Sequence, residues 1–166
     1  MRITLIVTLI VMACVAACIV NTPPPQGPSG RHEPLATLER TPCFGFCPVY
    51  KVTIFRDGIV EYEGVRFVKT VGTATGRISA RRLARVRALF ERNGYFQFAD
   101  SYQNYSVTDL PSAITSYSPG GGRFKTVNHY LGDRSAPRAL TEIEDGIDRI
   151  VDIEQWIGAP GERPHT

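Results

Sequence analysis

Two cysteines, Cys43 and Cys47, stand four positions apart in the segment TPCFGFCPVYK. A pair at this spacing can form a disulfide bond, a thiolate metal site or a reversible redox couple. With Gly45 between them, the loop can close to the Cα separation of about 4.4 to 6.8 Å that a disulfide requires. The choice among the three depends on the compartment, because disulfides persist in oxidising environments.

The first twenty residues, MRITLIVTLIVMACVAACIV, indicate export. Arg2 supplies a short positive region, and residues 3–15 are apolar and uncharged. This pattern is typical of a signal peptide, which we predict over residues 1–17. Residues 15–18, Val-Ala-Ala-Cys, resemble the lipobox of bacterial lipoproteins. By that resemblance Cys18 is lipidated and becomes the first residue of the mature chain.

Export then bears on the cysteine pair. Lipidation of Cys18 and loss of Cys14 with the signal peptide leave Cys43 and Cys47 as the mature pair, and we expect a disulfide between them. Their Cys-x₃-Cys-Pro spacing also resembles the copper-binding loop of the chaperones that serve cytochrome oxidase. A Cu(I) site of that kind would use His129 as a further ligand. A catalytic thiol pair is the other alternative; we expect no cofactor.

Three polar residues form a second candidate group. Asp100, Tyr102 and Asp109 fall in one predicted loop, close enough in sequence to form a polar cluster. Paired carboxylates can serve acid–base chemistry, so a hydrolase using Asp100 and Asp109 is an alternative. No nucleophile elbow, phosphate loop or zinc-type histidine pair accompanies them, and turn formation explains them equally. We therefore expect a binding or assembly module in preference to an enzyme.

Charge and location restrict the partners. The formal net charge is +3, which is too small to indicate nucleic-acid binding. We expect attachment to the membrane through lipid on Cys18, and an envelope protein or glycan as partner. Ile19 follows Cys18 at the position where lipoproteins retained in the inner membrane often carry aspartate. By that resemblance we expect the outer membrane, facing the periplasm. Four arginines form a basic stripe on a predicted helix that could contact anionic lipid or glycan, or face solvent: Arg81, Arg82, Arg85 and Arg92.

Composition divides the chain. Prolines and glycines alternate among polar residues from Asn21 to Arg31, so residues 18–34 read as a lipidated cysteine and an extended tether. Residues 35–157 have the length and apolar content of one domain. Residues 158–166 read as a flexible tail.

Periodicity within the domain predicts five strands and two helices. Alternating apolar residues place strands at 50–56, 59–63, 65–71, 112–118 and 124–130. Asp57-Gly58 is read as a two-residue turn between the first two strands. Apolar residues at helical spacing follow Ser79 and Pro137. The order βββ-α-ββ-α predicts an α+β fold with a mainly antiparallel sheet and both helices packed on one face.

Several residues together resemble a known bacterial family. They are the run from Pro42 to Val52, Asp57-Gly58, Tyr62-x-Gly64, Val68, Gly72, Asp100-x-Tyr102 and Thr108-Asp109-x-Pro111. In this pattern the chain, from about residue 38 to 157, resembles the domain of unknown function 6438. The resemblance implies an exported or lipid-anchored domain. It brings no established activity and no catalytic residues.

Overall fold

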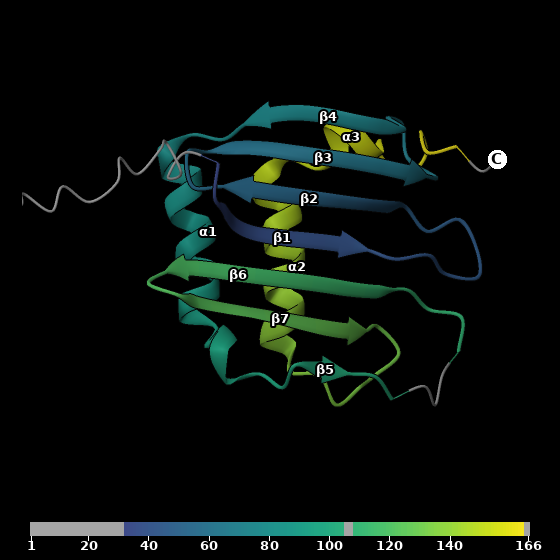
Figure 1. Cartoon of the computed structure of the whole chain (residues 1–166). Helices are drawn as coiled ribbons and strands as arrows, with labels where there is room; N and C mark the ends of the chain where they lie inside the picture. Colours follow the sequence, from purple (N-terminus) through teal and green to yellow (C-terminus); the bar gives the residue numbers. More distant parts are fainter. Residues whose placement is uncertain (1–31, 105–107, 165–166) are drawn as a thin grey trace, which may run out of the picture.

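The computed structural model describes residues 32–104 and 108–164 as one sheet with helices on one of its faces (Figure 1). The fold is α+β, as predicted from the sequence. The strands are β1 (Pro34–Arg40), β2 (Val49–Phe55), β3 (Ile59–Arg66), β4 (Gly72–Arg77), β5 (Ser101–Tyr102), β6 (Ser112–Gly120) and β7 (Arg123–Tyr130). The helices are α1 (Ala80–Arg92), the short 3₁₀-helix η1 (Tyr95–Gln97), α2 (Arg138–Val151) and α3 (Glu154–Ile157).

The seven strands lie in the order β4-β3-β2-β1-β6-β7-β5, so the first strand of the domain is central. Neighbouring strands are antiparallel except for β5, which runs parallel to β7. These directions bring the described residues of four connections to one end of the sheet: residues 41–48, 67–71, 103–104 with 108–111, and 131–137. We call it the disulfide end. β1 begins at the opposite end (Figure 1).

Strand prediction was wrong in the first half of the domain. The predicted strand 65–71 is mostly a loop: β3 ends at Arg66, and the next residue, Phe67, has a φ of 56°, which is incompatible with a strand. The Tyr62 hydroxyl donates to the Thr70 carbonyl at 3.1 Å and holds this loop against β3. The partner strand is β4 instead, whose sequence GTATGR has weak strand propensity.

Two further strands, β1 and β5, were not predicted. In β1 the sequence PLATLER buries Leu35 and Ala36 in succession at a register shift, so apolar and polar residues do not alternate cleanly. β5 has only two residues and is formed by its parallel pairing with β7. Both strands depend on partners distant in sequence.

The first hairpin has a longer turn than predicted. β2 and β3 are joined by three residues, Arg56 to Gly58, and the Gly58 N–H donates to the Phe55 carbonyl at 3.0 Å. Within this turn only Gly58 has a positive φ, 84°. The hairpin is therefore of the three-residue type in which glycine takes the left-handed position.

Both main helices begin and pack much as their sequences indicate. The Ser79 hydroxyl accepts from the Arg82 N–H at 3.3 Å and caps α1. Pro137 occupies the N-cap position, one residue before α2, whereas the sequence pattern predicted it within the first turn. Gly146 lies against Leu89, so the two helices approach closely at that point. None of the helices in the described residues is long and apolar enough to span a bilayer.

Candidate functional site

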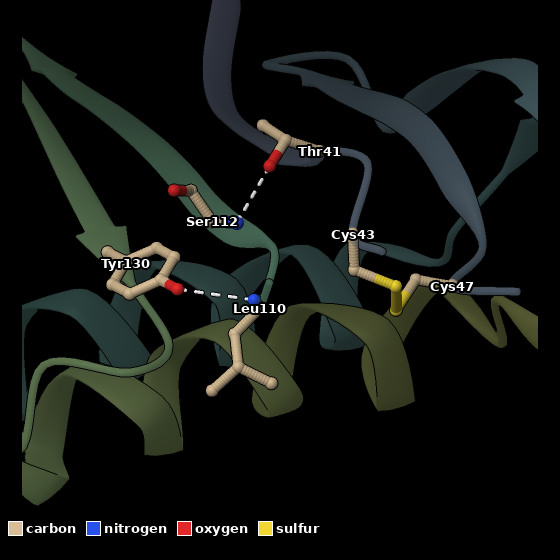
Figure 2. Close-up of a disulfide and its surroundings, with 6 residues drawn as sticks. All are labelled: Thr41, Cys43, Cys47, Leu110, Ser112 and Tyr130. Carbon is tan, nitrogen blue, oxygen red and sulfur yellow. Dashed lines mark hydrogen bonds between the residues drawn. A yellow bond between two sulfur atoms is a disulfide. The ribbon is translucent and has the colours of Figure 1, made fainter. Parts of the chain in front are cut away.

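The disulfide loop, residues 43–47, connects β1 to β2 at the disulfide end. Cys43 and Cys47 form a disulfide with their Cα atoms 5.8 Å apart (Figure 2). This is the pair that the sequence predicted. Because the bond closes a short ring, the loop loses conformational freedom before any partner binds.

Hydrogen bonds join this loop to the connection that precedes β6. The Phe44 N–H donates to the Asp109 carbonyl at 3.1 Å. At the end of β1, the Thr41 N–H donates to the Ser112 carbonyl at 3.0 Å, and the Ser112 N–H donates to the Thr41 hydroxyl at 2.7 Å (Figure 2). The two connections therefore form one surface.

Large apolar side chains are exposed at this end of the sheet. Six of the seven such side chains in residues 32–104 and 108–164 lie at the disulfide end: Phe44, Phe46, Val65, Val71, Leu110 and Leu131. We call these six the apolar rim. Phe44 is the most exposed, at 88%, whereas the seventh, Phe124, lies beside the β6–β7 turn at the opposite end. Exposed apolar residues that gather in one place mark interaction sites.

Phe67 packs against Phe46 of the rim. Its left-handed backbone costs about 1 kcal/mol in a non-glycine residue. That conformation places its ring edge-to-face with Phe46, with ring centroids 5.3 Å apart. The Arg66 guanidinium lies 5.0 Å from the centre of the Phe67 ring. A cation–aromatic contact thus holds a positive charge beside the exposed phenylalanines.

Charged side chains of both signs lie around the rim. Arg66, Lys69 and Arg134 are exposed in or beside these connections, as is Asp109. Two further exposed carboxylates lie beside them: Asp145, 3.3 Å from Arg40, and Glu162, which lies near Lys69. Asp133 is buried, and its carboxylate accepts hydrogen bonds from backbone and hydroxyl groups of the neighbouring loops. The solvent-facing charge around the rim is therefore mixed.

A second group of polar residues lies beneath α2. Strand register places Tyr50 of β2 beside Arg40 of β1, Arg40 beside Ala113 of β6, and Ala113 beside His129 of β7. Side chains opposite one another in a sheet point to the same face. We call Tyr50, Arg40 and His129 the polar row.

Two acidic residues of α2, one turn apart, meet this row. Asp148 accepts from the Arg40 guanidinium at 2.9 Å and from the Tyr50 hydroxyl at 2.8 Å. Glu144 Oε1 lies 2.8 Å from His129 Nδ1, and both side chains are buried. The other Glu144 oxygen is buried without a hydrogen-bond partner, 3.8 Å from an Arg40 nitrogen.

Burial dominates the electrostatics of this network. It raises the pKa of Glu144 against the opposing effect of His129, and the pKa of Asp148 against that of Arg40. Burial, followed by the charge of Asp148, also raises the pKa of Tyr50. Burial acts to lower the pKa of Arg40, but Asp148 and the other acidic groups raise it overall. Because these groups pair with one another, the network fixes α2 on three strands.

The metal ligands proposed from the sequence are not brought together as free groups. The two cysteine sulfurs are bonded to each other, and His129 is buried against Glu144. Among the described residues no group of three or more His, Cys, Asp or Glu side chains is placed to hold a metal ion. Cys18, the predicted lipidation site, and Cys14 lie outside the described residues.

The predicted polar cluster is not assembled in the structure. Asp100 pairs with Lys125 of β7. The Tyr102 hydroxyl accepts a backbone N–H from three residues earlier, at 3.1 Å. Asp109 has a φ of 74° and accepts from the hydroxyl of the preceding threonine at 3.2 Å. Each residue thus has its own local partner, in keeping with a structural role in the loop.

The basic stripe of α1 is exposed along its length: Arg81, Arg82, Arg85 and Arg92. Arg92 donates through Nε to the carbonyl of Ala88, one turn earlier, at 3.1 Å. The opposite face of the helix buries Val86 and Phe90, as its spacing predicted. The stripe lies on a different part of the molecule from the apolar rim.

Neither the rim nor the polar row was predicted from the sequence, although each has a recognisable sequence pattern. Two phenylalanines flank a glycine inside a disulfide loop that is too short to bury them. Glu144 and Asp148 interrupt the apolar face of α2 at helical spacing. Acidic residues on a buried helix face require buried partners, so the second signal pointed to basic or hydroxyl groups on the sheet.

The fold and this end together define a small α+β domain with an open sheet, a disulfide-closed loop and an exposed apolar rim. The chain belongs to the family described as Domain of unknown function (DUF6438), whose model matches residues 34–151. No curated protein and no solved structure matches the chain.

Proposed function

We propose that this protein is a lipid-anchored domain of the bacterial cell envelope that acts by binding or assembly, and that the apolar rim is its binding surface. The observation that carries the proposal is the collection of six exposed apolar side chains at one end of the sheet. Burying one such side chain in a partner contributes about 1.5 to 3 kcal/mol. A few of them suffice for a specific contact.

The rim is organised before binding. The disulfide holds the loop that carries Phe44 and Phe46, and the bond from the Phe44 N–H to Asp109 joins that loop to the one carrying Leu110. A loop already held in its bound conformation loses less entropy when a partner binds. This supports recognition by a preformed surface.

Attachment rests on the sequence. The lipobox-like segment ends at Cys18, and about 15 residues separate it from β1. In an extended, proline-rich conformation such a tether reaches about 45 Å. It would let the domain move at the surface of the outer membrane, on the periplasmic side, while remaining attached.

Membrane fractionation tests the anchor. Cys18→Ser should move the protein from the detergent fraction to the soluble fraction, or leave it with an uncleaved signal peptide. Cys14→Ser is the matched control and should leave processing unchanged. If the Cys18→Ser protein is processed normally and stays in the membrane fraction, the lipoprotein assignment is wrong.

Site-specific crosslinking tests the binding surface. A photoreactive phenylalanine analogue is placed at Phe44, or at Phe124 as the control, in cells that express the full chain. We expect crosslinked products from position 44 at several times the level from position 124, because both side chains are exposed and only the first lies on the rim. Equal yields at the two positions would contradict a binding role for the rim.

A further inference from the structure

We infer that the outer edge of β4 is an interaction site at which this protein pairs with a second copy of itself, as two antiparallel strands. The inference goes beyond the binding role proposed for the apolar rim and does not depend on it. It rests on the open edge of the sheet, on the strand register and on the charges beside β4.

The two edges of the sheet differ in how much they offer a partner. β5, at one edge, has only two residues, and so short a strand gives little to pair with. β4, at the other edge, has six residues and pairs with β3 without a register shift. Its sequence, GTATGR, contains no proline or lysine, which commonly prevent strand addition. Figure 1 shows no other described helix or strand beyond β4 on that side.

Unpaired backbone groups line the outer edge of β4. The Ile78 N–H donates to the Gly58 carbonyl at 2.9 Å, so the backbone of Ile78 faces β3. Residues of an antiparallel strand face the neighbouring strand and away from it in alternation, so the backbone groups of Thr73, Thr75 and Arg77 face outward. Within the described part of the chain these outward groups have no hydrogen-bond partner. Another extended strand supplies the donors and acceptors that match them.

The outward groups fix the register of self-pairing. A twofold axis at Thr75 places this residue opposite its own copy, and places Arg77 opposite Thr73 of the partner subunit. Each of these pairs can exchange both of its backbone hydrogen bonds. Both copies use the same surface, as in a closed twofold dimer. The side chains of Thr73, Ala74, Thr75 and Gly76 are small, so the two strands can approach.

The charge of Arg77 has a complement in this register. Glu63 of β3 pairs with Thr73 and is exposed, whereas the preceding Tyr62 is buried, so Glu63 lies on the sheet face away from the helices. The partner's Arg77 lies opposite Thr73 on the same face. Two strand spacings, about 10 Å, then separate its Cα from that of Glu63, a distance that an arginine and a glutamate can bridge over a threonine.

One basic residue already lies beside Glu63. Lys51 of β2 pairs with Glu63 on one side and with Glu39 of β1 on the other, so it stands between two carboxylates. The sheet face beside β4 thus retains an acidic group that an incoming arginine can neutralise. Arg77 now donates to the Asp57 carbonyl at 2.9 Å, an exposed hydrogen bond that water can replace.

Like charges are kept apart in this register. Glu61 pairs with Thr75 next to the axis, and three strand spacings, about 14 Å, separate it from its copy. That distance exceeds the screening length of about 10 Å. The two Arg77 residues lie at opposite ends of the paired strands, also about 14 Å apart.

Oxidative crosslinking tests the inference on the full-length protein, purified in detergent and treated with the thiol oxidant diamide. A covalent trap is used because an edge contact between small domains is weak. In Thr75→Cys the introduced thiols lie at the axis, with Cα atoms about 5.5 Å apart, which a disulfide can span. Thr73→Cys is the matched control, since it lies on the same strand and face but about 14 Å from its copy. The parent chain, with its four cysteines, gives the background.

We expect Thr75→Cys to form covalent dimer at several times the level of Thr73→Cys and of the parent. Equal yields from the two variants would show that the copies do not pair in this register. No dimer above the parent level from Thr75→Cys would overturn self-pairing at β4 altogether. Neither result bears on the apolar rim, whose test is crosslinking from Phe44.

Charge exchange tests the contact across the axis. In the Thr75→Cys background, Arg77→Glu should reduce the dimer yield severalfold, because it places a carboxylate near Glu63 of the partner subunit. Adding Glu63→Arg should restore the yield, which a folding defect would not allow. Arg85→Glu, on the basic stripe of α1, changes the net charge equally and should leave the yield unchanged. If the exchange does not restore the yield, or Arg85→Glu lowers it as much as Arg77→Glu does, the inferred pairing is wrong.

Discussion

The Asp148 carboxylate of α2 accepts from Arg40 at 2.9 Å and from Tyr50 at 2.8 Å, so one side chain fixes the helix on two neighbouring strands. Asp148→Asn removes the charge opposite a largely buried guanidinium. We expect a loss of about 2 to 3 kcal/mol in the free energy of unfolding, measured by urea titration.

An exposed ion pair on the same helix provides the control. Arg138 and Glu142 pair in solvent, and such pairs contribute less than about 0.5 kcal/mol. Glu142→Gln should therefore leave the unfolding midpoint almost unchanged. A loss for Asp148→Asn no larger than this would show that the contact with Arg40 and Tyr50 does not stabilise the fold.

The Glu144 carboxyl makes stability depend on pH. Burial raises its pKa above the ordinary value of 4.5, so the folded protein holds this proton more tightly than the unfolded chain. The stabilisation is complete below pH 4.5 and is lost as the pH rises through the raised pKa. Glu144→Gln resembles the protonated acid and should gain stability relative to the parent over that interval.

Denaturant midpoints of the parent and of Glu144→Gln, measured at several pH values, check this expectation. The difference between the two midpoints should shift in favour of the variant as the pH increases. Glu142→Gln, at an exposed site, should give a constant difference. A constant difference for Glu144→Gln as well would contradict a raised pKa for Glu144.

The disulfide should contribute modestly to stability. For so short a ring the chain-entropy estimate is about 2 kcal/mol, so the double change Cys43→Ser and Cys47→Ser should lower stability by about that amount and leave the fold intact. Alkylation of the unfolded, unreduced mature protein should find neither thiol free. Stoichiometric Cu(I) binding by reduced protein, lost in His129→Ala, would instead favour the copper alternative.

The turn between β2 and β3 requires glycine for two reasons. Gly58 has a φ of 84°, and a Cβ there would lie 2.7 Å from the Ile78 carbonyl oxygen. Gly58→Ala should therefore cost about 1 to 3 kcal/mol in unfolding free energy. Gly121→Ala isolates the backbone term, since Gly121 also has a positive φ, 64°, but has no atoms near its Cβ position. Equal losses for the two variants would show that the carbonyl contact is unimportant.

Sequence patterns predicted the elements that form through interactions between residues close together in the chain. Helices α1 and α2 follow from apolar residues at helical spacing, and the Ser79 cap follows from its position before the first turn. The two hairpins follow from alternating residues around glycine-containing turns. Cysteine count and the predicted export signal led to the expected disulfide, because lipidation of Cys18 and loss of Cys14 would leave Cys43 and Cys47 as the mature pair.

Long-range pairing decided what these patterns could not. β1 is the central strand because β2 and β6, far apart in the chain, both pair with it. The polar row exists because strand register aligns Tyr50, Arg40 and His129 under the acidic residues of α2. A short stretch of sequence contains neither the strand register nor the residues that pack against it. The pairs between the polar row and α2 could therefore not be predicted from local patterns.

The apolar rim also combines features that are visible in the sequence with features that strand pairing sets. Sequence alone shows that phenylalanines flank Gly45 in a short loop between cysteines, and its first twenty residues are the basis for predicting export. The placement of Val65, Val71, Leu110 and Leu131 at the same end as that loop is visible only in the folded structure. The physical reason is strand direction, since antiparallel pairing brings connections that are distant in sequence to one end of the sheet.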